Sequence, residues 1–272
     1  MPAWHRSRNP VLPQRSLLID AARHLALQGG ALTLCGITVM AISGLRWHAL
    51  AAALLAYGVI GVLILSGLEH HAPHRRFGPA NSVTLLRAAY AAFLVGVLVA
   101  GAPLDPGARW LLAGFGFLSL LLDGVDGWWA RRSGFASAFG ARFDLETDAF
   151  FVLALSALLY HSGQAGAWVL TAGLMRYTFV AAGWLWSALA APLPPSRRRK
   201  VICVVLILAL LTALTPAVGG EAARLLCFAA MALLIYSFGA DCIWLIATAR
   251  RVSAPLRGRG MSEGLGRSMG SE

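Results

Sequence analysis

Charged residues are scarce in this 272-residue chain: they make up 13% of it, whereas hydrophobic residues make up 58%. A soluble domain carries about 25% charged residues, so the composition excludes an ordinary soluble fold and predicts an integral membrane protein. Acidic residues are the rarest charge, 12 against 23 Lys and Arg. The resulting net charge of +11 is explained by arginines that meet anionic lipid headgroups, and it requires no nucleic-acid partner.

Cysteine motifs are also lacking. The four cysteines have no CxxC spacing, so we expect small buried hydrophobic residues rather than a redox or zinc site. No cleavable signal peptide and no internal repeat is evident.

Long apolar segments dominate what is present, and most of them reach the ~20 residues that a membrane-spanning helix needs. We count eight, at roughly residues 31–47, 48–68, 82–102, 108–130, 143–161, 165–191, 201–218 and 223–249. If all eight cross a membrane and the N-terminus is cytoplasmic, 18 of the 23 Lys and Arg fall on the cytoplasmic side and three fall outside. This asymmetry satisfies the positive-inside rule and predicts that both termini are cytoplasmic.

Five of the twelve acidic residues lie in one short stretch between two of these segments, DGVDGWWARRSGFASAFGARFDLETD, residues 123–148. Helical spacing divides its polar and small residues between two faces, one on each of two antiparallel neighbouring helices. The first face holds Asp123, Asp126, Gly127, Ala130 and Arg131, and the second holds Gly140, Asp144 and Asp148. Glu146 points away from the second face. Four carboxylates therefore converge in one pocket.

Four carboxylates in a low-dielectric pocket cannot all stay ionised without compensation. Either some of them are protonated, or divalent cations bind between them. Sites built only from oxygen ligands suit Mg²⁺ or Mn²⁺. The small residues leave room for a ligand to approach the backbone, and Arg131 is well placed for a phosphate. The pattern favours a diphosphate site. An ion or solute transporter that uses the aspartates as a relay is the alternative. An intramembrane prenyltransferase fits less well, because its aspartate motifs lie on helices far apart in sequence.

The spacing D-x2-D-G-x2-A-R-x8-G-x3-D-x3-D resembles the signature of the CDP-alcohol phosphotransferase (CDP-alcohol phosphatidyltransferase) family, and all eight positions are present. The resemblance implies a six-helix membrane core, usually homodimeric, with one or two Mg²⁺ or Mn²⁺ ions in a cytoplasm-facing site. We therefore expect an all-α integral membrane protein with this core and two extra N-terminal transmembrane helices. The expected enzyme moves a phosphatidyl group from CDP-diacylglycerol to a small alcohol and releases CMP, in phospholipid biosynthesis (EC 2.7.8.-).

The resemblance also implies roles for individual residues. The metal ligands would be Asp123, Asp126, Asp144 and Asp148, with Asp148 also the general base. The CDP-binding residues would be Asp123, Asp126, Gly127, Ala130, Arg131 and Gly140, together with Asn81 and Thr84 from GPANSVTLLR, a looser match to the family's P-N-x-x-T-x-x-R-like opening. The acceptor-binding residues would be Arg87, Arg176, Arg199 and Lys200.

We expect five divisions of the chain: a basic cytoplasmic N-terminus (1–25), two extra transmembrane helices (26–68), a juxtamembrane segment (69–81), the six-helix catalytic core (82–250) and a disordered basic tail (251–272). The histidines of the juxtamembrane segment are expected to meet the membrane interface rather than a metal. The enzyme would lie in the bacterial inner membrane. The sequence assigns no function to the two extra helices and does not identify the acceptor.

Overall fold

The structure, a computed structural model, describes residues 15–43, 46–71, 74–133, 137–186, 189, 191, 193–194 and 196–253. Within these ranges it leaves out the side chains of residues 43, 125–133 and 250–253. The described residues form helices and no strand. The helices are α1 (Arg15–Ser43), α2 (Trp47–Gly67), α3 (Pro79–Ala100), α4 (Pro106–Ser133), α5 (Ala138–His161), α6 (Thr171–Leu185), α7 (Arg197–Leu214) and α8 (Gly220–Ser253), with the short 3₁₀ helices η2 (Leu68–His71) and η3 (Ala167–Leu170).

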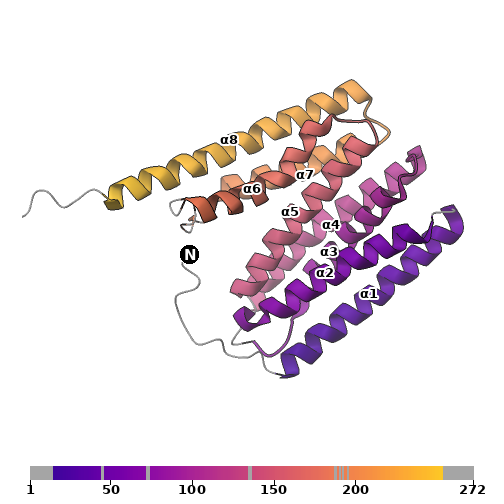
Figure 1. The fold of residues 1–272 in the computed structure, drawn as a ribbon, viewed down its shortest axis with the longest axis horizontal. Helices are drawn as coiled ribbons and strands as arrows, with labels where there is room; N and C mark the ends of the chain where they lie inside the picture. Colours follow the sequence, from indigo (N-terminus) through magenta and orange to yellow (C-terminus); the bar gives the residue numbers. More distant parts are fainter. Residues whose placement is uncertain are drawn as a thin grey trace, which may run out of the picture.

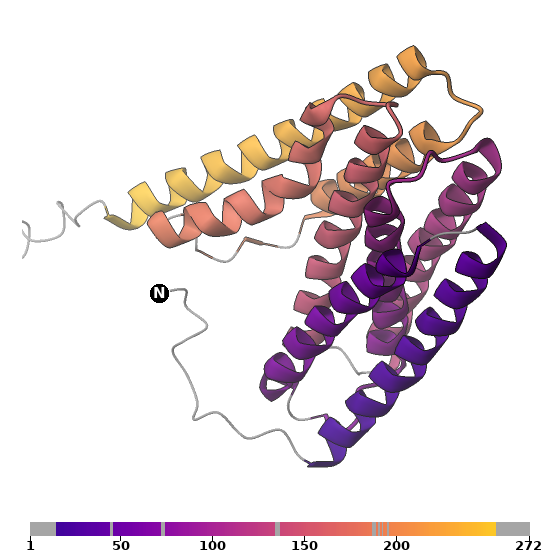
Figure 2. The ribbon, with the colours of Figure 1, turned by 45° about the vertical axis from the view of Figure 1, so that its right-hand side comes forward.

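The first five helices follow a common direction, and the later ones are inclined to them (Figure 1). Helix α8 runs past α6 and α7 at a shallow angle, and its C-terminal end extends beyond the other helices in both ribbon views (Figures 1 and 2). The ring of Phe179 on α6 meets the ring of Phe238 on α8 edge to face, with 5.7 Å between the centroids. The middle of α8 therefore contacts α6.

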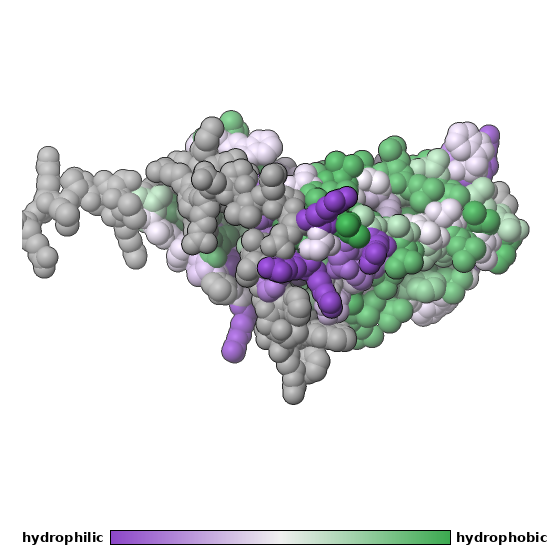
Figure 3. Space-filling model, turned by 90° about the horizontal axis from the view of Figure 1, so that it is seen from below, coloured by the Kyte–Doolittle hydropathy of each residue, from purple (hydrophilic) through white to green (hydrophobic). Residues whose placement is uncertain are grey.

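Four of the described helical segments are long and apolar enough to cross a membrane: Arg15–Ile42, Trp47–His71, Pro79–Ala100 and Gly220–Ala249. Hydrophobic side chains cover much of the surface in Figure 3, and hydrophilic ones gather near the middle of that view. The expected all-helical membrane architecture is confirmed. Each of the eight apolar segments overlaps a helix, whereas crossing by all eight stays a prediction.

Helix α1 begins at Arg15, well before the apolar segment expected from about residue 31. Its first turns bury Leu17 and Ala21 in a cluster with residues of α2, α3 and α5. Tertiary packing therefore extends the helix into a stretch whose average composition is polar, as contacts commonly override local preference.

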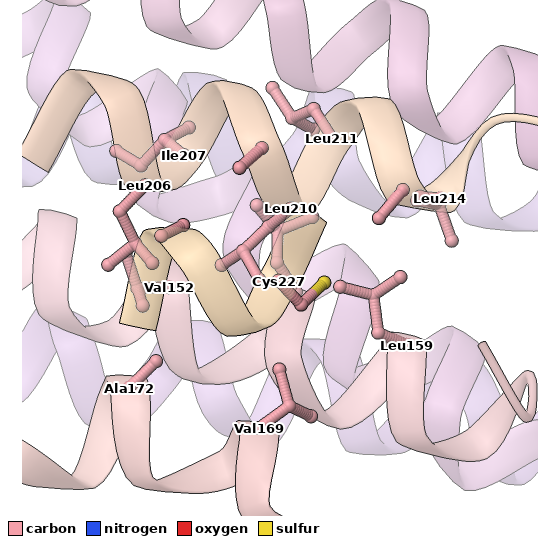
Figure 4. Close-up of a cluster of buried hydrophobic side chains, with 14 of the residues drawn as sticks. Val152, Leu159, Val169, Ala172, Leu206, Ile207, Leu210, Leu211, Leu214 and Cys227 are labelled. Carbon is pink, nitrogen blue, oxygen red and sulfur yellow. The ribbon is translucent and has the colours of Figure 1, made fainter. Parts of the chain in front are cut away.

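Helix α3 lies between two hydrophobic cores. Leu85, Ala89 and Ala92 face the N-terminal cluster with α1 and α2. Ala91 and Leu94 face a larger cluster with α4, α5, α6, α7 and α8. Figure 4 shows part of this larger cluster, where leucines of α7 lie over side chains of α5 and Cys227 of α8. The buried alanines of α3 keep it narrow, so both groups of helices can approach it.

Glycines mark two close contacts with the backbone of a neighbouring helix. A Cβ on Gly96 of α3 would lie 2.6 Å from the carbonyl oxygen of Ala49 on α2. A Cβ on Gly173 of α6 would lie 2.4 Å from Cα of Leu153 on α5. Small residues let membrane helices pack this closely, so these glycines set the positions of α2 and α6 against the core.

Candidate functional site

Three aspartates from two neighbouring helices converge at one end of the helices. Asp123 lies in the second half of α4, and Asp144 and Asp148 lie in the first half of α5. One carboxylate oxygen of each lies within 4.8 Å of the others, and all three side chains are half-buried. The helical spacing predicted this convergence.

Helix α5 begins at this point because Ser137 caps it. The Ser137 hydroxyl accepts a hydrogen bond from the backbone N–H of Gly140 at 3.0 Å. A serine in this position satisfies one of the unpaired N–H groups of the first turn. The cap sets the register of the following turns, which carry Asp144 and Asp148.

Arg87 of α3 lies among the three carboxylates. Its Nη1 is 2.8 Å from Oδ1 of both Asp123 and Asp144, and its Nη2 donates to Asp148. The Arg87 side chain is 2% exposed, whereas those of the aspartates are 19–40% exposed. Arg87 was expected to bind the acceptor, and the structure places it within the aspartate cluster.

The charge of this cluster is suited to a divalent cation. Three carboxylates against one guanidinium leave two excess negative charges, and such an excess in a partly dry site requires compensation. The atoms that the aspartates can offer to a metal are all oxygens, which are the ligands that Mg²⁺ and Mn²⁺ prefer. Asp123, Asp144 and Asp148 therefore fit the role of metal ligands.

Asn81 of α3 lies against Gly140 of α5. A Cβ at position 140 would lie 2.8 Å from Oδ1 of Asn81, so only glycine permits this approach. The Asn81 amide donates to the carbonyl oxygen of Phe77 at 2.6 Å, and the Thr84 hydroxyl donates to that of Ala80 at 3.2 Å. Asn81 and Thr84 are both buried. Two positions predicted from separate motifs thus meet directly.

Four predicted site residues lie in the last turns of α4, where the structure describes the backbone only. The side chains of Asp126, Gly127, Ala130 and Arg131 lie outside the described part of the structure.

The arginines expected at the acceptor side pair with acidic residues. Arg176 of α6 donates to Glu146 of α5 at 2.6 Å. Arg199 of α7 lies 3.4 Å from Oδ1 of Asp241 on α8 and donates to a backbone carbonyl. Lys200 is exposed and interacts electrostatically with Asp144. The start of α7 therefore brings positive charge toward the aspartates.

Two further residues of this region, Arg198 and Ser137, were not assigned to the site from the sequence. Arg198 donates to Asp241 at 2.5 Å and to the Ser237 carbonyl at 3.3 Å, so it holds α7 to α8. Ser137 was not assigned a role, although a serine just before a helical pattern is a recognisable capping signal.

The helices and the carboxylate cluster define a helical membrane protein with a group of three aspartates whose spacing suits a metal ion. The sequence matches the family model for CDP-alcohol phosphatidyltransferase over residues 77–238, more than half of the chain. The chain belongs to this family, which confirms the resemblance seen in the sequence. No curated protein matches it, and no solved structure matches it.

The family consists of transferases of substituted phosphate groups that generally depend on divalent metal, and it is associated with phosphatidyl transfer in phospholipid synthesis. The matched region begins at Phe77. Helices α1 and α2 and the linker after them (residues 68–76) therefore lie outside the matched region.

Proposed function

We propose that this chain transfers the phosphatidyl group of CDP-diacylglycerol to the hydroxyl of a small alcohol. The acceptor oxygen forms a bond to the β-phosphorus, the bond from that phosphorus to the CMP phosphate breaks, and CMP leaves. The observation that carries the proposal is the convergence of Asp123, Asp144 and Asp148 around Arg87, in a chain that belongs to this family.

We propose that Asp123, Asp126, Asp144 and Asp148 hold one or two Mg²⁺ or Mn²⁺ ions. A bound divalent ion supplies charge stabilisation to the diphosphate and to the leaving CMP. By holding the ion between α4 and α5, the four aspartates would fix the position of its positive charge and so orient the diphosphate. Arg87 contributes a fixed positive charge beside them.

The nucleotide would lie along the two helices where their side chains are smallest. Gly127, Ala130 and Gly140 would leave that space, and Arg131 would face a phosphate. Asn81 and Thr84 would bound the same slot from α3; the Asn81–Gly140 contact is the support for this assignment.

Asp148 is the proposed general base. It would accept the proton of the acceptor hydroxyl as the oxygen attacks, and it would hold that hydroxyl in line. The acceptor would enter from the side of α6 and α7, where the proposed acceptor-binding residues besides Arg87 are Arg176, Arg199 and Lys200. The charge of Lys200 acting on Asp144 supports this direction of entry.

We propose the following arrangement of the enzyme in its membrane. Residues 82–250 form the catalytic core after the two added helices, and the site and both termini face the cytoplasm, in the bacterial inner membrane. A homodimer is expected from the family resemblance.

The decisive experiment measures CMP release from CDP-diacylglycerol by the purified full chain in detergent, with a panel of small alcohols. We expect acceptor-dependent release that a chelator abolishes and that Mg²⁺ or Mn²⁺ restores. A transporter or a prenyltransferase would release no CMP. Full activity in excess chelator would refute the metal assignment.

A further inference from the structure

Helix α1 presents a polar face to the start of α3. Asp20, His24 and Gln28 are spaced four residues apart, which places them on one face. Asp20 Oδ2 accepts a hydrogen bond from the backbone N–H of Phe77 at 2.8 Å. The Gln28 amide donates to the Ser82 carbonyl at 2.9 Å and to its hydroxyl at 3.1 Å, and His24 Nδ1 lies 3.0 Å from that hydroxyl. A helix outside the family match therefore holds the first turn of the first core helix.

The linker after α2 makes a second connection through His71, which is fully buried rather than interfacial. Its Nε2 is 2.9 Å from the carbonyl oxygen of Arg76, which can only accept, so Nε2 carries a proton. The Nδ1 of the neutral ring then accepts from the Ser137 hydroxyl at 2.8 Å. Both ring nitrogens are thus used within the protein, and the partner hydroxyl is the cap of α5.

The two connections lead, through Phe77 and Ser137, to two residues that are in contact, Asn81 and Gly140. Phe77, held through its N–H by α1, accepts the Asn81 amide on its carbonyl oxygen at 2.6 Å. Ser137, held by the linker, accepts the N–H of Gly140 at 3.0 Å. Asn81 and Gly140 are in direct contact across α3 and α5.

Aromatic packing covers the His71 and Phe77 ends of these connections. The Phe139 ring lies 5.4 Å from the His71 ring and 6.4 Å from the Phe77 ring, between centroids. Phe77 and Phe139 are themselves buried. Hydrogen bonds in such surroundings are costly to leave unpaired.

We infer that α1 and the linker position the nucleotide-binding edge of the site, by fixing Asn81 and Gly140 relative to one another. This inference rests on the proposed function, in which these two residues bound the CDP slot. Asp144 and Asp148 lie one and two turns further along α5, so disturbing the edge weakens nucleotide binding more than it slows chemistry. Asp20 and His71 are the positioning residues.

The first test compares two variants of His71. His71→Phe keeps an aromatic ring and removes both hydrogen bonds, whereas His71→Gln retains a donor for the Arg76 carbonyl. We expect the KM for CDP-diacylglycerol to rise roughly tenfold in His71→Phe, as for one or two lost hydrogen bonds, and much less in His71→Gln. The kcat should change by less than about twofold. The control is His70→Phe, at the exposed neighbouring histidine.

The second test compares Asp20→Leu with Asp20→Asn, which keeps an oxygen to accept the Phe77 N–H. We expect a KM increase in the first variant and near-complete rescue in the second. Thr38→Val is the matched control, because the Thr38 hydroxyl donates to the Leu34 carbonyl of its own helix.

A third readout needs no activity: hydrogen exchange of peptides covering residues 78–84 and 137–143 in the full chain in detergent. Faster exchange in both peptides is expected for Asp20→Leu and His71→Phe, with neither control affected. If wild type releases no CMP, the proposed function fails, and the exchange data still decide whether this edge is positioned from α1 and the linker. Unchanged exchange, a fall in kcat without a change in KM, or equal loss in the conservative variants would overturn the inference.

Discussion

Two polar clusters of this molecule have opposite compositions. Around Arg87, three carboxylates meet one guanidinium that is 2% exposed. Around Asp241, two guanidiniums that are 34% and 30% exposed meet one carboxylate. The first cluster has excess negative charge and a buried centre, which suits a divalent cation. The second has excess positive charge around a buried carboxylate, and its guanidiniums are partly exposed, which suits an anionic group.

The two clusters should also differ in how much their ion pairs contribute to the stability of the fold. Removing one member of a buried ion pair leaves an uncompensated charge and costs about 3–5 kcal/mol, whereas exposed pairs contribute about 0–1 kcal/mol. Substitutions at the two clusters should therefore differ in size and in metal dependence.

The largest effect is expected at Asp148. Asp148→Asn keeps the shape and one oxygen but removes the charge and the proton acceptor, so turnover should fall at least ~10²-fold, the range for a lost general base. Affinity for CDP-diacylglycerol, measured by calorimetry in Mg²⁺, should be largely retained. Asp123→Asn should instead weaken metal and nucleotide binding together. Near-normal turnover of Asp148→Asn would move the base elsewhere, and complete loss of binding would make Asp148 chiefly a ligand.

The next effect is on stability. Arg87→Met removes the positive charge that three carboxylates share, so stability without divalent ions should fall by about 3 kcal/mol. Mg²⁺ should raise the Tm of this variant more than that of wild type, because the ion then replaces the positive charge that Arg87 supplied. Thermal unfolding with chelator and with Mg²⁺ measures both.

The comparison variant is Arg198→Met at the second cluster, whose guanidinium is 34% exposed. Its Tm loss should be smaller and independent of Mg²⁺. Equal Mg²⁺-induced shifts in wild type, Arg87→Met and Arg198→Met would contradict a cation site at Arg87.

The smallest effect is expected for Asp241→Asn, which leaves Arg198 and Arg199 without their anionic partner. Stability should fall by about 1 kcal/mol or less. The KM for a phosphate-bearing acceptor should fall a few-fold, because the freed guanidiniums can bind it, while kcat stays unchanged. An equal change in KM for an uncharged alcohol would argue against this charge effect.

Much of the site could be predicted from one stretch of sequence. Asp123, Asp144 and Asp148 belong to a single helical hairpin, so helical periodicity and a short connection were enough to bring them together. The eight helical segments were also predictable, because long apolar runs dominate the chain. Their ends were less so: α1 extends to Arg15 because packing against α2 and α3 stabilises turns that are polar on average.

Contacts between distant segments were beyond this reasoning. Arg87 was recognised as a site residue, but its partner Asp123 lies on α4 and its other two partners lie 57 and 61 residues away along the chain, on α5. The burial of His71 depends on the cap of α5, 66 residues further on. Nothing in the local pattern of either segment determines which helix lies next to it.

The sequence by itself determined that this is an all-helical membrane protein of the CDP-alcohol phosphatidyltransferase family, with a carboxylate site on one hairpin, because apolar length and helical spacing are properties of neighbouring residues. Only the tertiary structure decided that Arg87 lies among those carboxylates and that α1 and the linker contact the edge of the site. Those facts depend on how α3 packs between α2 and α5, which follows from side-chain fit across helices rather than from spacing along any one of them.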